Sequence, residues 1–234
     1  MKIFINGCSF SRGPDSWPYY IEKLCKSEIF NLALSGAGNT YIRHSTVCEL
    51  YKRSDYKLVI IMWSGLERLD FQVDDLAQFP DFSTSLYQSQ RNDWPEKIVE
   101  PFHDQDFVQK NWILGGTADE LQKHQLFLGL RKHVGIVQHA QRSLVDMLCL
   151  QEFLKSKRLP YVFAFYQNYL DLLKRKEPEL FQNLDLENVF NDPNIGDLIK
   201  QNHWVDEDGY HPSPHGHKIW ASMLHEWLVD KRLI

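Results

Sequence analysis

The sequence predicts an α/β protein with a parallel sheet covered by helices on both faces. The prediction depends on two observations. Four short apolar runs are rich in Ile, Val and Phe and do not alternate with polar residues as half-exposed strands do, which is typical of buried parallel strands. Segments with helical spacing lie between successive runs, so strand and helix alternate along the first part of the chain. The four runs span residues 2–6, 29–34, 57–63 and 161–166.

The helical segments follow in order. Residues 17–26 and 40–53 carry apolar side chains at helical spacing and separate the first three strands. A long stretch at about 119–158 has the same periodicity and stops before Pro160, because the residue before a proline disfavours helix. Glycines at two points predict that this stretch is divided into two pieces. A last helix is predicted over residues 214–228.

The segment at about 70–116 differs from the rest of the chain. It holds three prolines and ends in a glycine pair, and it lacks a clear period. A connection of this length inside a compact domain is uncommon unless it acts as a lid or a binding wall. We therefore expect an insertion that lines a binding site. Aromatic side chains in and before it are candidates for that wall, with core packing as the alternative for each: Trp63, Phe71, Phe79, Phe82, Tyr87 and Trp94.

Composition excludes several classes of protein. The 234 residues are 43% hydrophobic and 24% charged and contain no linker-like tract, which predicts one soluble domain over residues 1–234. A net charge of -5 gives no clustered basic surface for nucleic acid or an anionic membrane. No run could span a bilayer, and residues 1–7 are too soon interrupted to be a signal peptide, so we expect a cytoplasmic protein. The four cysteines form no CxxC pair, and no cofactor is expected.

Reactive side chains follow the predicted strands. Ligands of open parallel sheets bind beyond the carboxyl ends of the strands, and Ser9 comes directly after the first one. Asp208 and His211 lie three residues apart on a glycine-containing loop near the C-terminal end. A serine needs a base, and the base needs a third group to orient it, so these residues supply the three parts of a nucleophilic triad. Each alone also suits a structural role, as a helix cap, a turn former or a loop histidine.

The combination resembles the SGNH (GDSL-like) hydrolases. The first motif is Gly7-Cys8-Ser9-Phe10-Ser11-Arg12-Gly13, similar to the family's G-D-S-x-x-x-G block. The second is Asn31-Leu32-Ala33-Leu34-Ser35-Gly36, and the last is Asp208-Gly209-Tyr210-His211-Pro212, which matches D-x-x-H-P and is followed by Gly216-His217. The motifs occur in the family's order along the whole chain. The resemblance implies a three-layer α/β/α sandwich, flavodoxin-like, with a parallel sheet of about five strands.

The chain departs from the family at two places. Cys8 replaces the aspartate before the serine, a residue outside the triad. In the third block the family has G-x-N-D, whereas this chain has Trp63-Ser64-Gly65-Leu66. The asparagine that would donate to the oxyanion is therefore missing. Losing one such donor typically costs about 3 kcal/mol of transition-state stabilisation. Asn39, the Ser64 hydroxyl and the Gly65 amide are the candidate substitutes.

The resemblance implies a serine esterase for a short-acyl ester, such as an O-acetylated carbohydrate. Ser9 would attack the ester carbonyl with His211 as general base and Asp208 as its partner. The amides of Ser9 and Gly36 would hold the oxyanion. An O-acyltransferase would use the same residues with a hydroxyl acceptor in place of water. The altered third block also fits a carbohydrate-binding or structural module with weak or no turnover.

Two further interpretations are weaker. His211, His215 and His217, with Asp206 or Asp208, have residue types that suit zinc or a non-haem metal, but the same loop matches a metal-free motif, so no metal is expected. Residues 35–39 follow a strand and precede a helix, as a phosphate-binding loop does. They lack the G-x-G-x-x-G spacing, and the tight turn alone accounts for their glycines.

Overall fold

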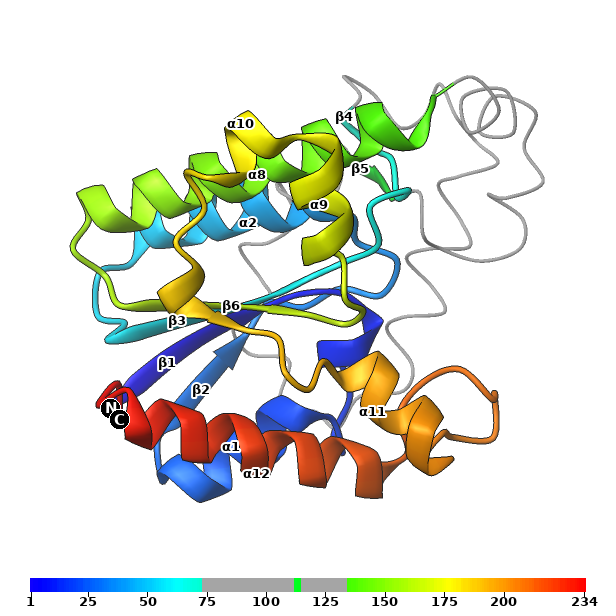
Figure 1. Cartoon of the computed structure of the whole chain (residues 1–234). Coiled ribbons are helices and arrows are strands. Elements are labelled where there is room, and N and C mark those ends of the chain that lie inside the picture. The colour runs from blue at the N-terminus through cyan, green and yellow to red at the C-terminus, as the bar shows by residue number, and fades with distance from the viewer. Residues whose placement is uncertain (73–111, 115–133) are drawn as a thin grey trace.

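The computed structural model describes residues 1–72, 112–114 and 134–234, and in them a five-stranded sheet lies between two helical layers (Figure 1). All neighbouring strands of this sheet are parallel. The order is β2-β1-β3-β6-β7, which is the flavodoxin-like order with its topological switch point between β1 and β3. The predicted three-layer α/β/α sandwich is confirmed. The strands are β1 (Lys2–Asn6), β2 (Glu28–Asn31), β3 (Leu58–Trp63), β6 (Tyr161–Phe165) and β7 (Val189–Phe190).

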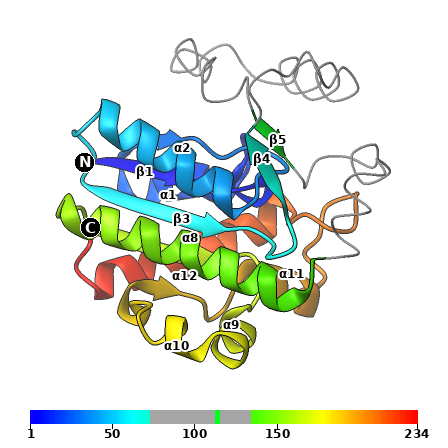
Figure 2. The ribbon, with the colours of Figure 1, turned by 90° about the horizontal axis from the view of Figure 1, so that it is seen from above.

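Helices cover both faces of the sheet. Helices α1 and α12 pack together on one face, with α11 beside α12, and α2 and α8 pack together on the other, with α9 and α10 beside α8 (Figures 1 and 2). Short 3-10 turns, η1 (Ser9–Ser11) and η5 (Leu186–Asn188), follow β1 and precede β7. The helices are α1 (Trp17–Cys25), α2 (Asn39–Lys52), α8 (Ile136–Ser156), α9 (Leu170–Lys176), α10 (Pro178–Phe181), α11 (Ile195–Asn202) and α12 (Pro214–Asp230).

Local sequence signals explain where several helices begin and end. The helix α12 starts after Ser213, whose side chain accepts a hydrogen bond from the Gly216 N–H, with Pro214 in its first turn. The helix predicted over 119–158 begins at Ile136 in the described part and ends at Ser156, and residues 115–133 lie outside that part. No helix in the described ranges is both long and apolar enough to cross a membrane.

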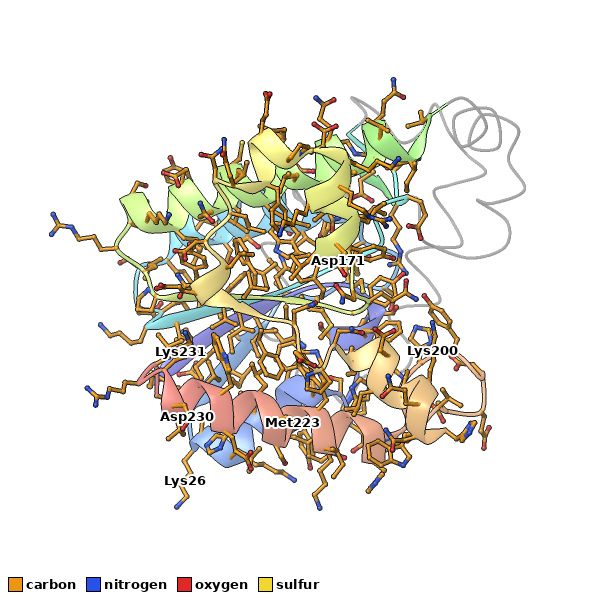
Figure 3. The ribbon with its side chains drawn as sticks, in the orientation of Figure 1. Lys26, Asp171, Lys200, Met223, Asp230 and Lys231 are labelled. Carbon is orange, nitrogen blue, oxygen red and sulfur yellow. The ribbon has the colours of Figure 1, made fainter. Side chains whose placement is uncertain are left out.

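Two apolar cores result from the alternation of side chains along the buried strands. In β1, Ile3 and Ile5 face α1 and α12, whereas Phe4 faces α2 and α8. Figure 3 shows side chains filling the space between the sheet and each helical layer, while Lys26 extends away from the body. Trp63 belongs to the α2 and α8 core with no exposed surface, packed on Phe163. The expectation that it lines a substrate wall is therefore wrong.

Only the ends of the predicted insertion are described. There β4 (Asp70–Gln72) pairs antiparallel with β5 (Trp112–Leu114) in a separate two-stranded sheet. Asp70 is buried, and its carboxylate accepts hydrogen bonds from the N–H groups of Gly38 and Tyr41 at the start of α2. The insertion is thus fastened to the main domain at its base. The other wall candidates lie outside the described side chains: Phe71, Phe79, Phe82, Tyr87 and Trp94.

Candidate active site

Ser9 is held in a tight turn directly beyond β1. The buried Cys8 accepts a hydrogen bond from the Ser11 N–H at 2.9 Å, and the Arg12 N–H donates to the Ser9 carbonyl at 3.2 Å. The Ser11 hydroxyl is fixed in turn by the Trp17 Nε1–H at 3.1 Å. The backbone around Ser9 is therefore rigid while its side chain stays half-buried at the surface. This is the carboxyl edge of the sheet next to the switch point, where ligands of such sheets bind.

Asp208 and His211 come from the loop between α11 and α12. The loop closes on itself, because the Asp206 N–H donates to the His211 carbonyl and Gly209, at φ +69°, makes the turn between them. One oxygen of Asp208 accepts the backbone N–H groups of Tyr210 and His211, each at 2.8 Å. The other oxygen lies 2.5 Å from His211 Nδ1. The carboxylate thereby fixes both the loop and the imidazole ring.

The three side chains form one continuous chain of hydrogen bonds. His211 Nε2 lies 2.9 Å from Ser9 Oγ, which joins residues 202 positions apart in the sequence. Because Nδ1 donates to Asp208, Nε2 carries the lone pair that can accept the serine proton. Partial burial acts to raise the pKa of Asp208, but hydrogen bonds from His211 and from the Tyr210 N–H outweigh it and lower that pKa to about 2. The carboxylate is thus ionised at neutral pH.

Aromatic side chains support the imidazole. The ring of Phe10, next to Ser9, contacts His211, Tyr210 and Tyr166 with centroid separations of 5.2, 5.5 and 4.9 Å. Tyr210 also meets the His211 ring edge to face. The sequence analysis did not single out Phe10 or Tyr166. Phe10 stands beside the proposed nucleophile and Tyr166 directly after β6, at the same edge of the sheet.

Gly36 lies in the turn that follows β2, beside the first motif. The Leu34 N–H donates to the Gly7 carbonyl, which ties the two turns together. Gly36 has φ +81°, a conformation that residues with a Cβ adopt only with strain. A substitution there would change the direction of the amide that we expect to bind the oxyanion.

Two of the three candidate substitutes for the missing asparagine, Asn39 and the Ser64 hydroxyl, are buried and are not part of the cleft wall. The Asn39 amide spans Ser64 and Ser143: its oxygen accepts the Ser64 N–H at 2.8 Å, and its nitrogen donates to the Ser143 hydroxyl at 3.0 Å. Asn39 is 2% exposed and Ser64 is completely buried. A hydroxyl with no accessible surface cannot meet a substrate. Gly65, at the place of the family's asparagine, is likewise buried.

A cleft of about 480 Å³ opens beside the triad. Its wall includes Ser9 and His211 together with Arg12, Ser35 and Asp206, so polar groups surround the reactive serine. A cleft of this size suits a small ligand, and its polar lining suits one with several hydroxyl groups.

His217 is a second histidine on the cleft wall. Its side chain is 7% exposed, and Nδ1 is buried with no hydrogen-bond partner among the described residues. Burial and the nearby His211 lower the pKa of His217 to about 4, although Asp206 acts to raise it. The sequence indicated His217 only as part of the last motif and as a weak candidate metal ligand. His215, by contrast, is exposed and packs on Trp204, and no cluster of three or more metal-ligating side chains occurs in the described ranges.

Solved structures of known proteins share the fold of this chain. No family model and no curated protein matches the sequence. Among solved structures, the chain is similar to TesA (12% identity, TM-score 0.56, 100% of each chain covered). It is also similar to the psychrotrophic esterase EstA from Pseudoalteromonas sp. (9%, 0.53, 98% of this chain and 97% of that one). A third is the acetyl xylan esterase AlAXEase (9%, 0.50, 98% and 99%). The chain therefore has the fold of the SGNH hydrolases, as its motifs indicated.

Proposed function

We propose that this protein is a serine esterase with Ser9 as nucleophile, His211 as general base and Asp208 as the partner of the base. The observation that carries the proposal is the unbroken chain from Ser9 Oγ through both ring nitrogens of His211 to the Asp208 carboxylate. A structural role for each residue alone would not require this alignment across 202 positions of sequence. The geometry meets the requirements for activating a serine hydroxyl.

The proposed reaction proceeds through an acyl-enzyme. Ser9 Oγ attacks the ester carbonyl carbon while its proton passes to His211 Nε2, and the carbonyl π electrons move onto oxygen. The amides of Ser9 and Gly36 face that developing charge. Collapse of the intermediate breaks the ester C–O bond, and His211 returns the proton to the leaving alcohol. Water then attacks the acyl carbon by the same steps and frees Ser9.

The substrate class we propose is a short-acyl ester of a hydroxyl-rich alcohol, such as an O-acetylated carbohydrate. The small, polar cleft beside Ser9 supports this, because Arg12, Asp15 and Asp206 can hydrogen bond to sugar hydroxyls. Two proteins of the same fold point the same way. One is described as an acetyl xylan esterase, and another as an esterase inhibited by monoethylphosphonate.

Fluorophosphonate labelling tests the proposal. Intact mass spectrometry of the wild type should show a single adduct that is lost in Ser9→Ala, and p-nitrophenyl acetate turnover should be lost with it. Ser156→Ala is the matched control, because Ser156 is exposed on α8 and should leave both unchanged. A folded wild type with neither adduct nor turnover would refute the esterase and favour a binding module of the same fold.

A further inference from the structure

The loop after β3 is fastened to the turn after β2, where the proposed oxyanion amide lies. Asn39 binds the backbone of Ser64, and Asp70 binds the N–H groups of Gly38 and Tyr41. Between them, the Arg68 guanidinium donates from Nη1 to the Ala37 carbonyl at 3.2 Å. A long cationic side chain, three residues beyond the place where the family has its asparagine, thus reaches the residue that follows the second block.

The Arg68 backbone is itself held in place. Its N–H donates to the Gly65 carbonyl, and its carbonyl accepts a hydrogen bond from the Arg142 guanidinium at 2.5 Å. Arg68 is half-buried. Within the described ranges no carboxylate lies within ion-pair distance of Arg68. Apart from the bond from Nη1 to Ala37, its side-chain N–H donors make no hydrogen bond to the residues described, and they are accessible from the surface. A guanidinium has five N–H donors and stays charged, so donors remain for a ligand.

The guanidinium lies beside the turn that carries the second proposed oxyanion donor. Ala37 directly follows Gly36, the second proposed oxyanion donor. Burial acts to lower the pKa of Arg68, but the nearby Cys8, Tyr166 and Tyr210 raise it. Cys8 directly precedes Ser9, and Tyr210 directly precedes His211. The charge therefore lies close to the immediate neighbours of the nucleophile, the base and the oxyanion amide.

We propose that Arg68 is a catalytic residue that donates an N–H to the ester carbonyl oxygen as negative charge develops there, in place of the missing third-block amide. The inference rests on the proposed esterase function and deepens it. Arg68 keeps its protons throughout: the charge on oxygen appears when Ser9 attacks, is stabilised by the guanidinium, and disappears when the C–O bond breaks. A charged donor in a partly desolvated site stabilises an oxyanion more strongly than a neutral amide does.

Kinetics of Arg68 variants test this role. With p-nitrophenyl acetate, Arg68→Met should lower kcat about 100- to 1000-fold while KM changes by less than about threefold, the pattern of a group that acts only in the transition state. Arg68→Lys keeps a cation, so its kcat should be at least about tenfold higher than that of Arg68→Met. Arg43→Met is the matched control, because Arg43 pairs with Asp146 between α2 and α8 and should leave kcat unchanged.

Chemical rescue separates catalysis from positioning. Added guanidinium ion should raise kcat of Arg68→Ala severalfold, and it should not act on the Ser9→Ala variant. Rescue failing in a folded Arg68→Ala variant, or an equal loss in the Met and Lys variants, would overturn the inference. So would a kcat of Arg68→Met within threefold of wild type. In each of these cases Ser9 labelling of the wild type persists and the esterase proposal stands. Absence of that labelling would overturn both. If the Met variant does not fold, the kcat of the Lys variant and the rescue of Arg68→Ala by guanidinium ion test the role of Arg68 in its place.

Discussion

Lowering the pH from 7 to 5 should destabilise the folded protein by about 2 kcal/mol through the single imidazole of His217. The ordinary pKa of a histidine is 6.5, and burial beside His211 lowers that of His217 to about 4. Between these two values the unfolded chain binds a proton that the folded chain does not. Protons therefore favour unfolding in this window, and the stability that His217 preserves at neutral pH decreases as the pH falls toward 4.

Urea unfolding at pH 7 and pH 5 measures this contribution. His217→Gln removes the titrating group and should lose about 2 kcal/mol less stability than the wild type between the two pH values. His215→Gln is the control, since it removes an exposed imidazole two residues away and should behave as the wild type does. The reasoning fails if wild type and His217→Gln lose the same stability on acidification. Asp208 does not interfere, because its pKa of about 2 lies below the window.

Two other substitutions give direct outcomes. Asp208→Asn should lower kcat with p-nitrophenyl acetate on the order of 10⁴-fold, because the amide favours the wrong tautomer of His211; a stopped assay measures it, and a loss under tenfold would contradict the triad. Gly196→Ala should destabilise the fold by about 2 kcal/mol or more, because the new Cβ would meet the Tyr166 carbonyl at 2.2 Å. Thermal unfolding checks this, and an unchanged Tm would show that the backbone at Tyr166, directly after β6, can move to accommodate the added methyl group.

The sequence was sufficient to predict the larger elements of the fold. The apolar runs at 2–6 and 57–63 correspond to β1 and β3, and the run at 29–34 overlaps β2, which ends earlier at Asn31. The fifth strand, β7, was not located, because two residues provide no hydrophobic pattern. The short helices α9 to α11 were also missed. Each has too few turns to display a period of its own, and each is held by packing on longer helices.

The candidate site was predictable where a motif fixes the residue and unpredictable where geometry decides. Ser9, Asp208 and His211 were predicted as a triad, and the structure brings them together. Asn39 was a candidate oxyanion donor because it follows the second motif, yet its amide is turned to Ser64 and Ser143. Arg68 was not considered, because nothing in the sequence shows that its long side chain reaches back to Ala37. Only the packing of two loops reveals that contact.

The hydrogen bond between Ser9 and His211 has a consequence for biosynthesis. A ribosome releases Ser9 well before His211 and the helix α12 that follows it, since the two residues are 202 positions apart. Since α12 packs on α1, a helix made late must dock against one made early before the triad exists. Nascent chains are therefore expected to remain inactive until α12 has emerged from the ribosome. Fluorophosphonate labelling of nascent chains on stalled ribosomes would then show the length of chain at which α12 docks.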